Sequence, residues 1–205
     1  MEDFLDGENL EAKERVRAFA QGREKGILTL WGPQPSGKTH LLRGAVALAQ
    51  KAGKNALYLG AGKNGLPQEQ DTLFLALDDI EILTPQDEKS LFLALEEARK
   101  GWALLLASRI PPACLPWAPE ITSRLSQGLV FRLRAPSEVS KRRILAARAQ
   151  ALGLCLPEGF LDYCLKHTKR DLASLVLLVE KVAEMSLEKG RAPTLALARE
   201  VMEEE

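Results

Sequence analysis

The sequence has no net charge, no long apolar run and no closely spaced pair of cysteines. Its 205 residues contain 28 Lys and Arg against 28 Asp and Glu, so the formal charge is zero. A balanced charge removes the long-range field that would draw a whole protein onto DNA or an anionic membrane. We therefore expect no direct binding to double-stranded DNA through bulk charge.

Signals for export or membrane insertion are also missing. The stretch Met1–Val16 is acidic and polar, whereas a signal peptide has a basic segment followed by an apolar one. No apolar run approaches the roughly 20 residues that span a bilayer. Cys114, Cys155 and Cys164 are far apart, which is typical of small apolar side chains rather than of disulfides or a metal site. We expect a cytoplasmic protein with no membrane partner.

What is present is the pattern of an α/β protein. Apolar residues make up 46% and charged residues 27%, close to globular averages, so disorder is excluded. Short apolar runs alternate with helical periodicity, which predicts parallel strands joined by crossover helices, each strand covered on both faces. The predicted strands are Ile27–Trp31, Asn55–Leu59, Leu73–Leu77, Ala103–Ala107 and Leu129–Leu133. The predicted helices are Asp6–Gln21, Lys38–Ala52, Pro85–Lys100 and a short one near Pro119–Leu125.

After Arg134 the strand pattern stops and only helical patterns remain. Ser137 has the position of an N-cap behind Pro136, and further helices should follow Pro157 and Pro193. Between those two helices, an apolar stripe at three- and four-residue spacing predicts another, with the members Leu172, Leu175, Val176, Val179, Val182, Ala183 and Leu187. The chain thus divides into an α/β domain over residues 1–134 and a helical domain over residues 135–205.

The strongest chemical signal is a phosphate-binding loop between the first strand and the second helix. It fits G-x-x-x-x-G-K-[ST], and a strand before and a helix after it are the context that such a loop needs. Its residues are Gly32, Pro33, Gln34, Pro35, Ser36, Gly37, Lys38 and Thr39. Lys38 would reach the β- and γ-phosphates of a nucleotide, and the Thr39 hydroxyl would ligate Mg²⁺. We include the adjacent His40 among the nucleotide-binding residues, packed behind the loop. A plain Gly/Pro turn before an ordinary helix is the other interpretation.

A pair of acids complements this loop. The third strand ends in Asp78 and Asp79, at the carboxyl edge of the sheet where open α/β folds bind ligands. We expect Asp78 to hold Mg²⁺, and Asp79 to orient or deprotonate the attacking water. Acids at a strand end are otherwise common in turns.

The order of motifs resembles the DnaA/Hda family of AAA+ ATPases. Phe4–Asn9 is similar to its F-x-x-G-x-N segment, Gly37–Leu42 to its phosphate loop, Leu77–Glu81 to its Walker B strand and Ala107–Pro112 to its sensor I region. The resemblance implies a P-loop AAA+ three-layer sandwich with a five-stranded parallel sheet and a small α-helical lid domain. It implies ATP or ADP and Mg²⁺ as cofactors, and an AAA+ partner, either a DnaA-like initiator or a second copy.

Two arginines take roles from this resemblance. Ser123–Leu125 is similar to the segment that carries the arginine finger, which makes Arg124 a catalytic residue acting on a neighbouring subunit; a solvated surface charge is the alternative. Arg170 matches the sensor II arginine of the lid, with a helix cap or salt bridge as its alternative.

Departures from the family pattern limit the function. Arg109 occupies the place of the sensor I acid, so it stays open whether ATP is hydrolysed, and we expect weak or partner-stimulated ATPase activity. The connection Gly60–Thr72 is too short for the helices that initiators use on single-stranded DNA. We expect no helix-turn-helix domain after the lid, and therefore no binding to origin DNA. The clamp-binding peptide is not visible in Met1–Leu5, so sliding-clamp binding is doubtful.

These features favour a nucleotide-dependent regulator of replication initiation. The alternatives are a non-catalytic adaptor or helicase-loader-like module that uses nucleotide only for assembly, and a P-loop kinase acting on a small molecule. An acceptor pocket would favour the kinase, and binding without turnover would favour the adaptor.

Overall fold

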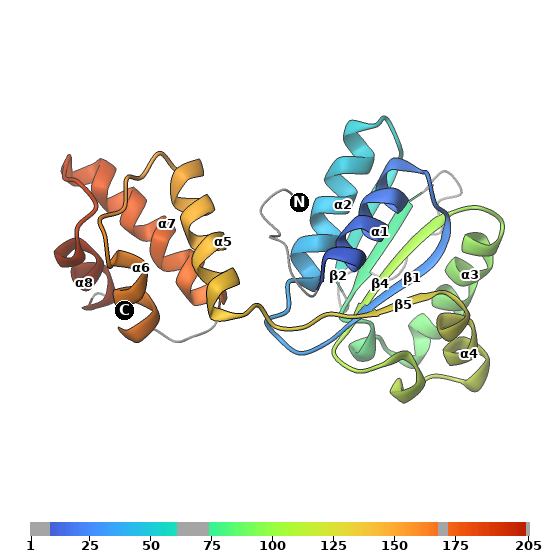
Figure 1. Ribbon diagram of the computed structural model, residues 1–205. Helices are drawn as coiled ribbons and strands as arrows, with labels where there is room; N and C mark the ends of the chain where they lie inside the picture. Colours follow the sequence, from blue (N-terminus) through green and yellow to red (C-terminus); the bar gives the residue numbers. More distant parts are fainter. Residues whose placement is uncertain (1–8, 61–73, 168–171, 204–205) are drawn as a thin grey trace. The chain divides into compact units, whose positions relative to one another are not determined.

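The structure is a computed structural model that describes residues 9–60, 74–167 and 172–203. The chain forms two compact units, and the boundary between them in the sequence falls between Ala135 and Pro136. One is an α/β unit built on a sheet, and the other is a helical unit (Figure 1). Within the described residues, no helix is both long and apolar enough to cross a membrane.

The α/β unit contains a five-stranded sheet in the order β2-β3-β4-β1-β5, with every pair parallel. Its strands are β1 (Gly26–Trp31), β2 (Ala56–Gly60), β3 (Phe74–Asp78), β4 (Ala103–Ser108) and β5 (Leu129–Arg132). The five predicted strands are confirmed to within one residue at each end. The expected α/β fold with a parallel sheet is therefore present.

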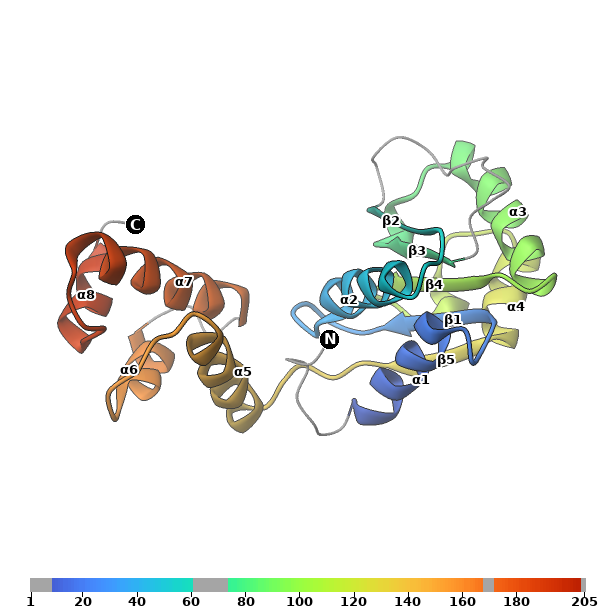
Figure 2. The same ribbon diagram turned by 90° about the horizontal axis from the view of Figure 1, so that it is seen from above.

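Four α-helices cover the two faces of this sheet. They are α1 (Leu10–Gln21), α2 (Lys38–Lys51), α3 (Glu88–Arg99) and α4 (Pro119–Gln127). Helices α1 and α2 lie on one face, and α3 and α4 lie on the other (Figures 1 and 2). The short 3₁₀ turns η1 (Ile80–Ile82), η2 (Pro85–Asp87) and η3 (Pro112–Cys114) lie in the connections on the α3 side. The result is the predicted three-layer arrangement.

The core follows from the alternation of side chains along buried strands. Leu104 and Leu106 of β4 pack with Leu91 and Leu95 of α3, while Leu105 between them is also fully buried and points to the other face. At about 25 cal/mol per Å² of apolar surface, burying one leucine contributes about 2 kcal/mol. Because both faces of the central strands are buried, their sequences are continuous apolar runs and do not alternate with polar residues.

One prediction about the sheet was wrong, because β5 is not covered on both faces. Leu129 and Val130 remain 37% and 38% exposed. The strand lies at the edge of the sheet beside β1 alone, so its apolar composition does not translate into full burial.

The helical unit has its own core. It consists of α5 (Glu138–Ala151), α6 (Phe160–His167), α7 (Leu172–Lys189) and α8 (Leu195–Glu203). Ser137 is the N-cap of α5, as predicted, and its hydroxyl accepts a hydrogen bond from the Ser140 N–H at 3.2 Å. The α7 stripe is buried at Leu175, Val179 and Val182 but ends early, because Leu187 is 87% exposed. Among the cysteines, only Cys164 is a buried core residue, whereas Cys114 and Cys155 are exposed.

Candidate nucleotide site

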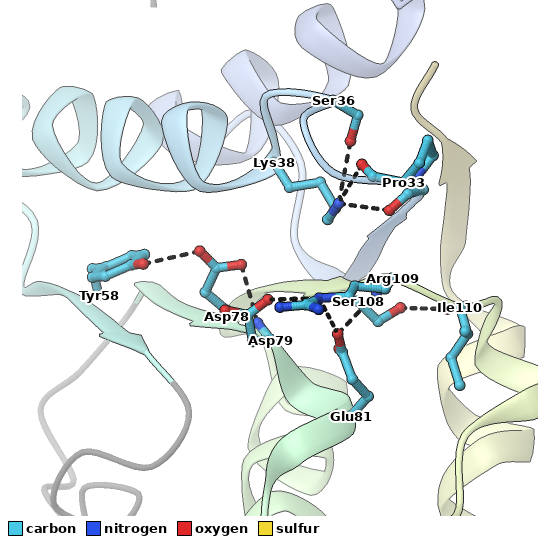
Figure 3. Close-up of polar contacts among 11 residues, drawn as sticks. Pro33, Ser36, Lys38, Tyr58, Asp78, Asp79, Glu81, Ser108, Arg109 and Ile110 are labelled. Carbon is cyan, nitrogen blue, oxygen red and sulfur yellow. Dashed lines mark hydrogen bonds and ion pairs between the residues drawn. The ribbon is translucent and has the colours of Figure 1, made fainter. Parts of the chain in front are cut away.

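The strand order brings three segments together at the carboxyl edge of the sheet. Strand β4 lies between β1 and β3, with Trp31 beside Ser108 and Leu77 beside Leu106. The phosphate loop after β1, the acids after β3 and the chain leaving β4 therefore face one another (Figure 3). This is the edge at which open parallel sheets bind ligands.

The loop needs glycine at its first position for a steric reason. Gly32 has φ +153°, and a Cβ atom there would lie 2.2 Å from the carbonyl oxygen of Leu133. Its N–H donates to the Ser108 carbonyl at 3.2 Å. Gly37 has φ 85° and is the N-cap of α2, so the first N–H groups of this helix, which have no intrahelical acceptors, point toward the loop.

Lys38 directs its ammonium group into this loop. Its Nζ donates to the Gly32 carbonyl at 2.6 Å, to the Pro33 carbonyl at 3.1 Å and to the Ser36 hydroxyl at 3.2 Å (Figure 3). The residue is only 5% exposed. Burial lowers the pKa of Lys38 below its ordinary value, an effect that the nearby Asp78 carboxylate opposes.

The next two residues of α2 are exposed. Thr39, the second residue of α2, has an exposed side chain, so its hydroxyl is available as a ligand. His40 is exposed too, so the prediction that it packs behind the loop was wrong. The core side of α2 is taken by Leu41 and Leu42, both fully buried, and helical geometry turns His40 away from that side.

Asp78 is held in place by two hydrogen bonds. Its Oδ2 accepts from the Tyr58 hydroxyl of β2 at 2.9 Å, and its Oδ1 accepts from the Asp79 N–H at 3.0 Å (Figure 3). Burial, followed by this hydrogen bond to Asp78, raises the pKa of Tyr58. The guanidinium carbon of Arg43 in α2 lies 5.0 Å from the centre of the Tyr58 ring. Sequence reasoning missed Tyr58. The feature that could have indicated it is a hydroxyl-bearing side chain on the apolar strand β2, which pairs with β3.

Asp79 has the left-handed backbone conformation, with φ 50° and ψ 46°, a region that residues other than glycine seldom occupy. Its Oδ1 lies 4.0 Å from Nε of Arg109, and this Nε lies 3.3 Å from Oε1 of Glu81. Glu81 is a second residue that sequence reasoning did not include in the site. Its signal was an acid three residues after Asp78, on the turn that follows the strand.

The donor set fits Mg²⁺ that is shared with a nucleotide. Among the described residues, no group of three or more His, Cys, Asp or Glu side chains could hold a metal ion by itself. Mg²⁺ commonly binds through one or two protein oxygens together with phosphate oxygens and water. Asp78 and Thr39 are the protein groups that suit this arrangement.

Arg124 is not at the phosphate loop. Its guanidinium forms ion pairs with Glu96 of α3 at 3.1 Å and Glu120 of α4 at 3.0 Å, and its Cζ lies 4.0 Å from the Phe92 ring centre. Its side chain is 16% exposed, so Arg124 is partly buried and is not the solvated surface charge that was its alternative interpretation. Arg170, the predicted sensor II residue, lies outside the described residues.

Comparison with known proteins shows a family match for the helical unit and a common fold for the chain. Residues 138–202 match the family of the Hda lid domain. Domain III of the replication initiation protein DnaA from Thermotoga maritima has a TM-score of 0.82 at 22% identity, and the match covers 99% of this chain and 95% of that one. The chain has a DnaA/Hda-like AAA+ fold.

The same fold recurs in other solved structures. AMPPCP-bound DnaA from Aquifex aeolicus matches with a TM-score of 0.72 at 23% identity over 88% of this chain, which spans 63% of that one. The RuvB Holliday junction branch migration motor of Thermotoga maritima matches with a TM-score of 0.70 at 17% identity, over 99% of this chain and 70% of that one. A fold of this kind therefore occurs both in a replication initiation protein and in a branch migration motor.

Proposed function

We propose that this protein is a nucleotide-dependent regulator of replication initiation that binds ATP or ADP with Mg²⁺ and acts on an AAA+ partner. The observation that carries the proposal is the buried Lys38 ammonium inside a glycine-bounded loop, opposite Asp78. The Lys38 ammonium donates its hydrogen bonds to neutral oxygens, and a phosphate group would form stronger, charge-assisted hydrogen bonds with it. The fold shared with AMPPCP-bound DnaA supports the same ligand class.

Each residue then has a defined task. The N–H groups at the start of α2 and the Lys38 ammonium hold the β- and γ-phosphates. Asp78 and Thr39 hold Mg²⁺, which neutralises charge on those phosphates when bound. Tyr58 donates a hydrogen bond that orients the Asp78 carboxylate, and Asp79 would accept a hydrogen bond from the attacking water.

Nucleotide binding is tested by calorimetry with ATP and ADP in the presence of Mg²⁺. Lys38→Ala should weaken binding at least about tenfold, because it removes a charge-assisted contact to phosphate. Lys51→Ala is the matched control, since Lys51 is exposed in the last turn of the same helix. Equal affinity of the two variants would contradict the proposed site.

The partner is tested by adding this protein to a purified DnaA-like initiator and measuring phosphate release. As the candidate arginine finger, Arg124 is the residue to change, and Arg124→Gln should remove the stimulation while nucleotide binding stays intact. Glu120→Gln is the control, because it removes one ion-pair partner of Arg124 and leaves the guanidinium in place. Stimulation by Arg124→Gln as strong as that of the unmodified protein would exclude this mechanism.

One observation favours a second candidate, the non-catalytic adaptor. Arg109 Nε lies 4.0 Å from Oδ1 of Asp79, the residue expected to orient or deprotonate the attacking water. An adaptor would bind ATP without hydrolysis even when the partner is present. The regulator would instead give ATP hydrolysis once the partner is added.

A further inference from the structure

The position of Arg109 follows from the strand order. It is the first residue after β4, and β4 lies between the strand that leads into the phosphate loop and the strand that ends in Asp78. Arg109 is consequently close enough to Lys38 for its charge to lower the pKa of that residue. A second cation thus faces the region between Lys38 and Asp79 (Figure 3).

Glu81 holds Arg109 in this position. Its Oε1 accepts a hydrogen bond from the Arg109 backbone N–H at 3.2 Å and lies 3.3 Å from the Arg109 Nε. The Glu81 side chain is only 13% exposed, and its Oε2 is buried with no hydrogen-bond partner in the described part of the chain. A carboxylate in such surroundings needs a neighbouring cation, so the Glu81–Arg109 pair is a built feature and not a chance surface contact.

The same guanidinium restrains Asp79. Asp79 has a left-handed backbone conformation, and its carboxylate lies on the side of Arg109, with Oδ1 4.0 Å from Nε. Attraction to this cation competes with the hydrogen bond that Asp79 would have to accept from water. Arg109 itself is 52% exposed, so a bound protein could reach it and draw it away without disturbing the core.

From this geometry we infer that Arg109, anchored by Glu81, acts as a brake on ATP hydrolysis by restraining Asp79. The inference rests on the proposed nucleotide site and names its regulation. In the restrained reaction, the water oxygen forms a bond to the γ-phosphorus while the bond from that phosphorus to the ADP oxygen breaks. The water proton passes to Asp79 and then to the released phosphate. Arg109 is a positioning residue here, and it acts through Asp79.

The test compares four full-length variants under single-turnover conditions with ATP and Mg²⁺. Arg109→Gln removes the charge and keeps a long polar side chain, and Arg109→Lys keeps the cation. The double variant Arg109→Gln/Asp79→Asn removes the residue through which the brake acts. Arg15→Gln is the matched control, because Arg15 is an exposed arginine of α1 that pairs with Glu24 at 2.6 Å. Affinity for a fluorescent ATP analogue and thermal unfolding are measured for each variant.

Arg109→Gln should hydrolyse ATP about tenfold faster or more, a part of the roughly 10²–10⁴-fold that a positioned acid or base contributes. Its affinity for ATP should change less than about twofold. Arg109→Lys should show only a small part of the gain, the double variant should lose it, and Arg15→Gln should match the unmodified protein.

Several results would overturn the inference. A rate for Arg109→Gln that is unchanged or lower shows that no brake exists. A loss of affinity for ATP but not ADP in this variant shows instead that Arg109 contacts the γ-phosphate. A gain that persists in the double variant shows that Asp79 is not the restrained group. If the unmodified protein binds no nucleotide at all, the proposed function itself is wrong. That outcome differs from a protein that binds nucleotide but has no brake, so failure of the function and failure of the inference are distinguishable.

Discussion

Replacing Gly32 by alanine tests how tightly the phosphate loop is built into the sheet. The new Cβ atom would lie 2.2 Å from the Leu133 carbonyl oxygen and 3.1 Å from its carbonyl carbon, at a residue with φ +153°. The unfavourable backbone conformation costs about 1–3 kcal/mol, and the clash with backbone that cannot rotate away costs about 1–3 kcal/mol. We expect a loss of about 2–6 kcal/mol, a large fraction of the stability of an ordinary domain.

Three other glycines separate the two contributions to this cost. Gly53 has φ +76° and open space around its Cβ position, so Gly53→Ala should cost about 1–2 kcal/mol from the backbone alone. Gly128 has an ordinary φ of −76°, but its Cβ would lie 2.6 Å from the Ile27 carbonyl oxygen, so Gly128→Ala should cost about 1–3 kcal/mol from crowding. Gly60 has neither feature, and Gly60→Ala should stay within about 0.5 kcal/mol of the unmodified protein.

Urea unfolding followed by tryptophan fluorescence is the suitable assay. All three tryptophans lie in the α/β unit, so the signal reports that unit alone, from Trp31, Trp102 and Trp117. Gly32→Ala should also weaken ATP binding, because the Gly32 carbonyl positions the Lys38 ammonium at 2.6 Å. If Gly32→Ala costs no more than Gly53→Ala, the steric argument for this loop is wrong.

Three further predictions concern charged and polar groups of the α/β unit. Burial lowers the pKa of Lys38 from 10.5. As the pH rises toward 10.5, Lys38 therefore loses its proton in the folded protein before it does so in the unfolded chain, which makes the folded state relatively more stable. In urea unfolding, the stability of the unmodified protein relative to Lys38→Met should increase between about pH 7 and about pH 10. A flat difference would contradict this. Tyr58→Phe removes the hydrogen bond to Asp78 and should raise the Mg²⁺ concentration needed for half-maximal ATP binding about tenfold; an unchanged Mg²⁺ titration would rule out that role. Arg124→Ala removes the ion pair with Glu96 and should lower the free energy of unfolding by about 1–2 kcal/mol, and thermal unfolding that stays the same would show that this contact adds nothing.

Local patterns were enough to predict much of the fold. The five parallel strands and the Ser137 cap follow from apolar runs and capping chemistry, which act between residues close in the chain. The phosphate loop was predictable for the same reason, because its glycines and Lys38 are contiguous. Burial was predicted less well. Strand β5 is apolar but lies at the edge of the sheet, and Leu187 is apolar but lies near the end of α7, so neither is covered by a further described element.

The sequence by itself determined the two-part organisation, the phosphate loop and the acids that end the third strand, because each is encoded by neighbouring residues. The tertiary structure alone decided that Tyr58 holds Asp78, that Glu81 anchors Arg109 beside Asp79, and that Arg124 is held by α3. These contacts join residues whose proximity depends on the strand order β2-β3-β4-β1-β5 and on the helices packed over it. That order is set by packing across the whole sheet, so no local motif could have revealed them.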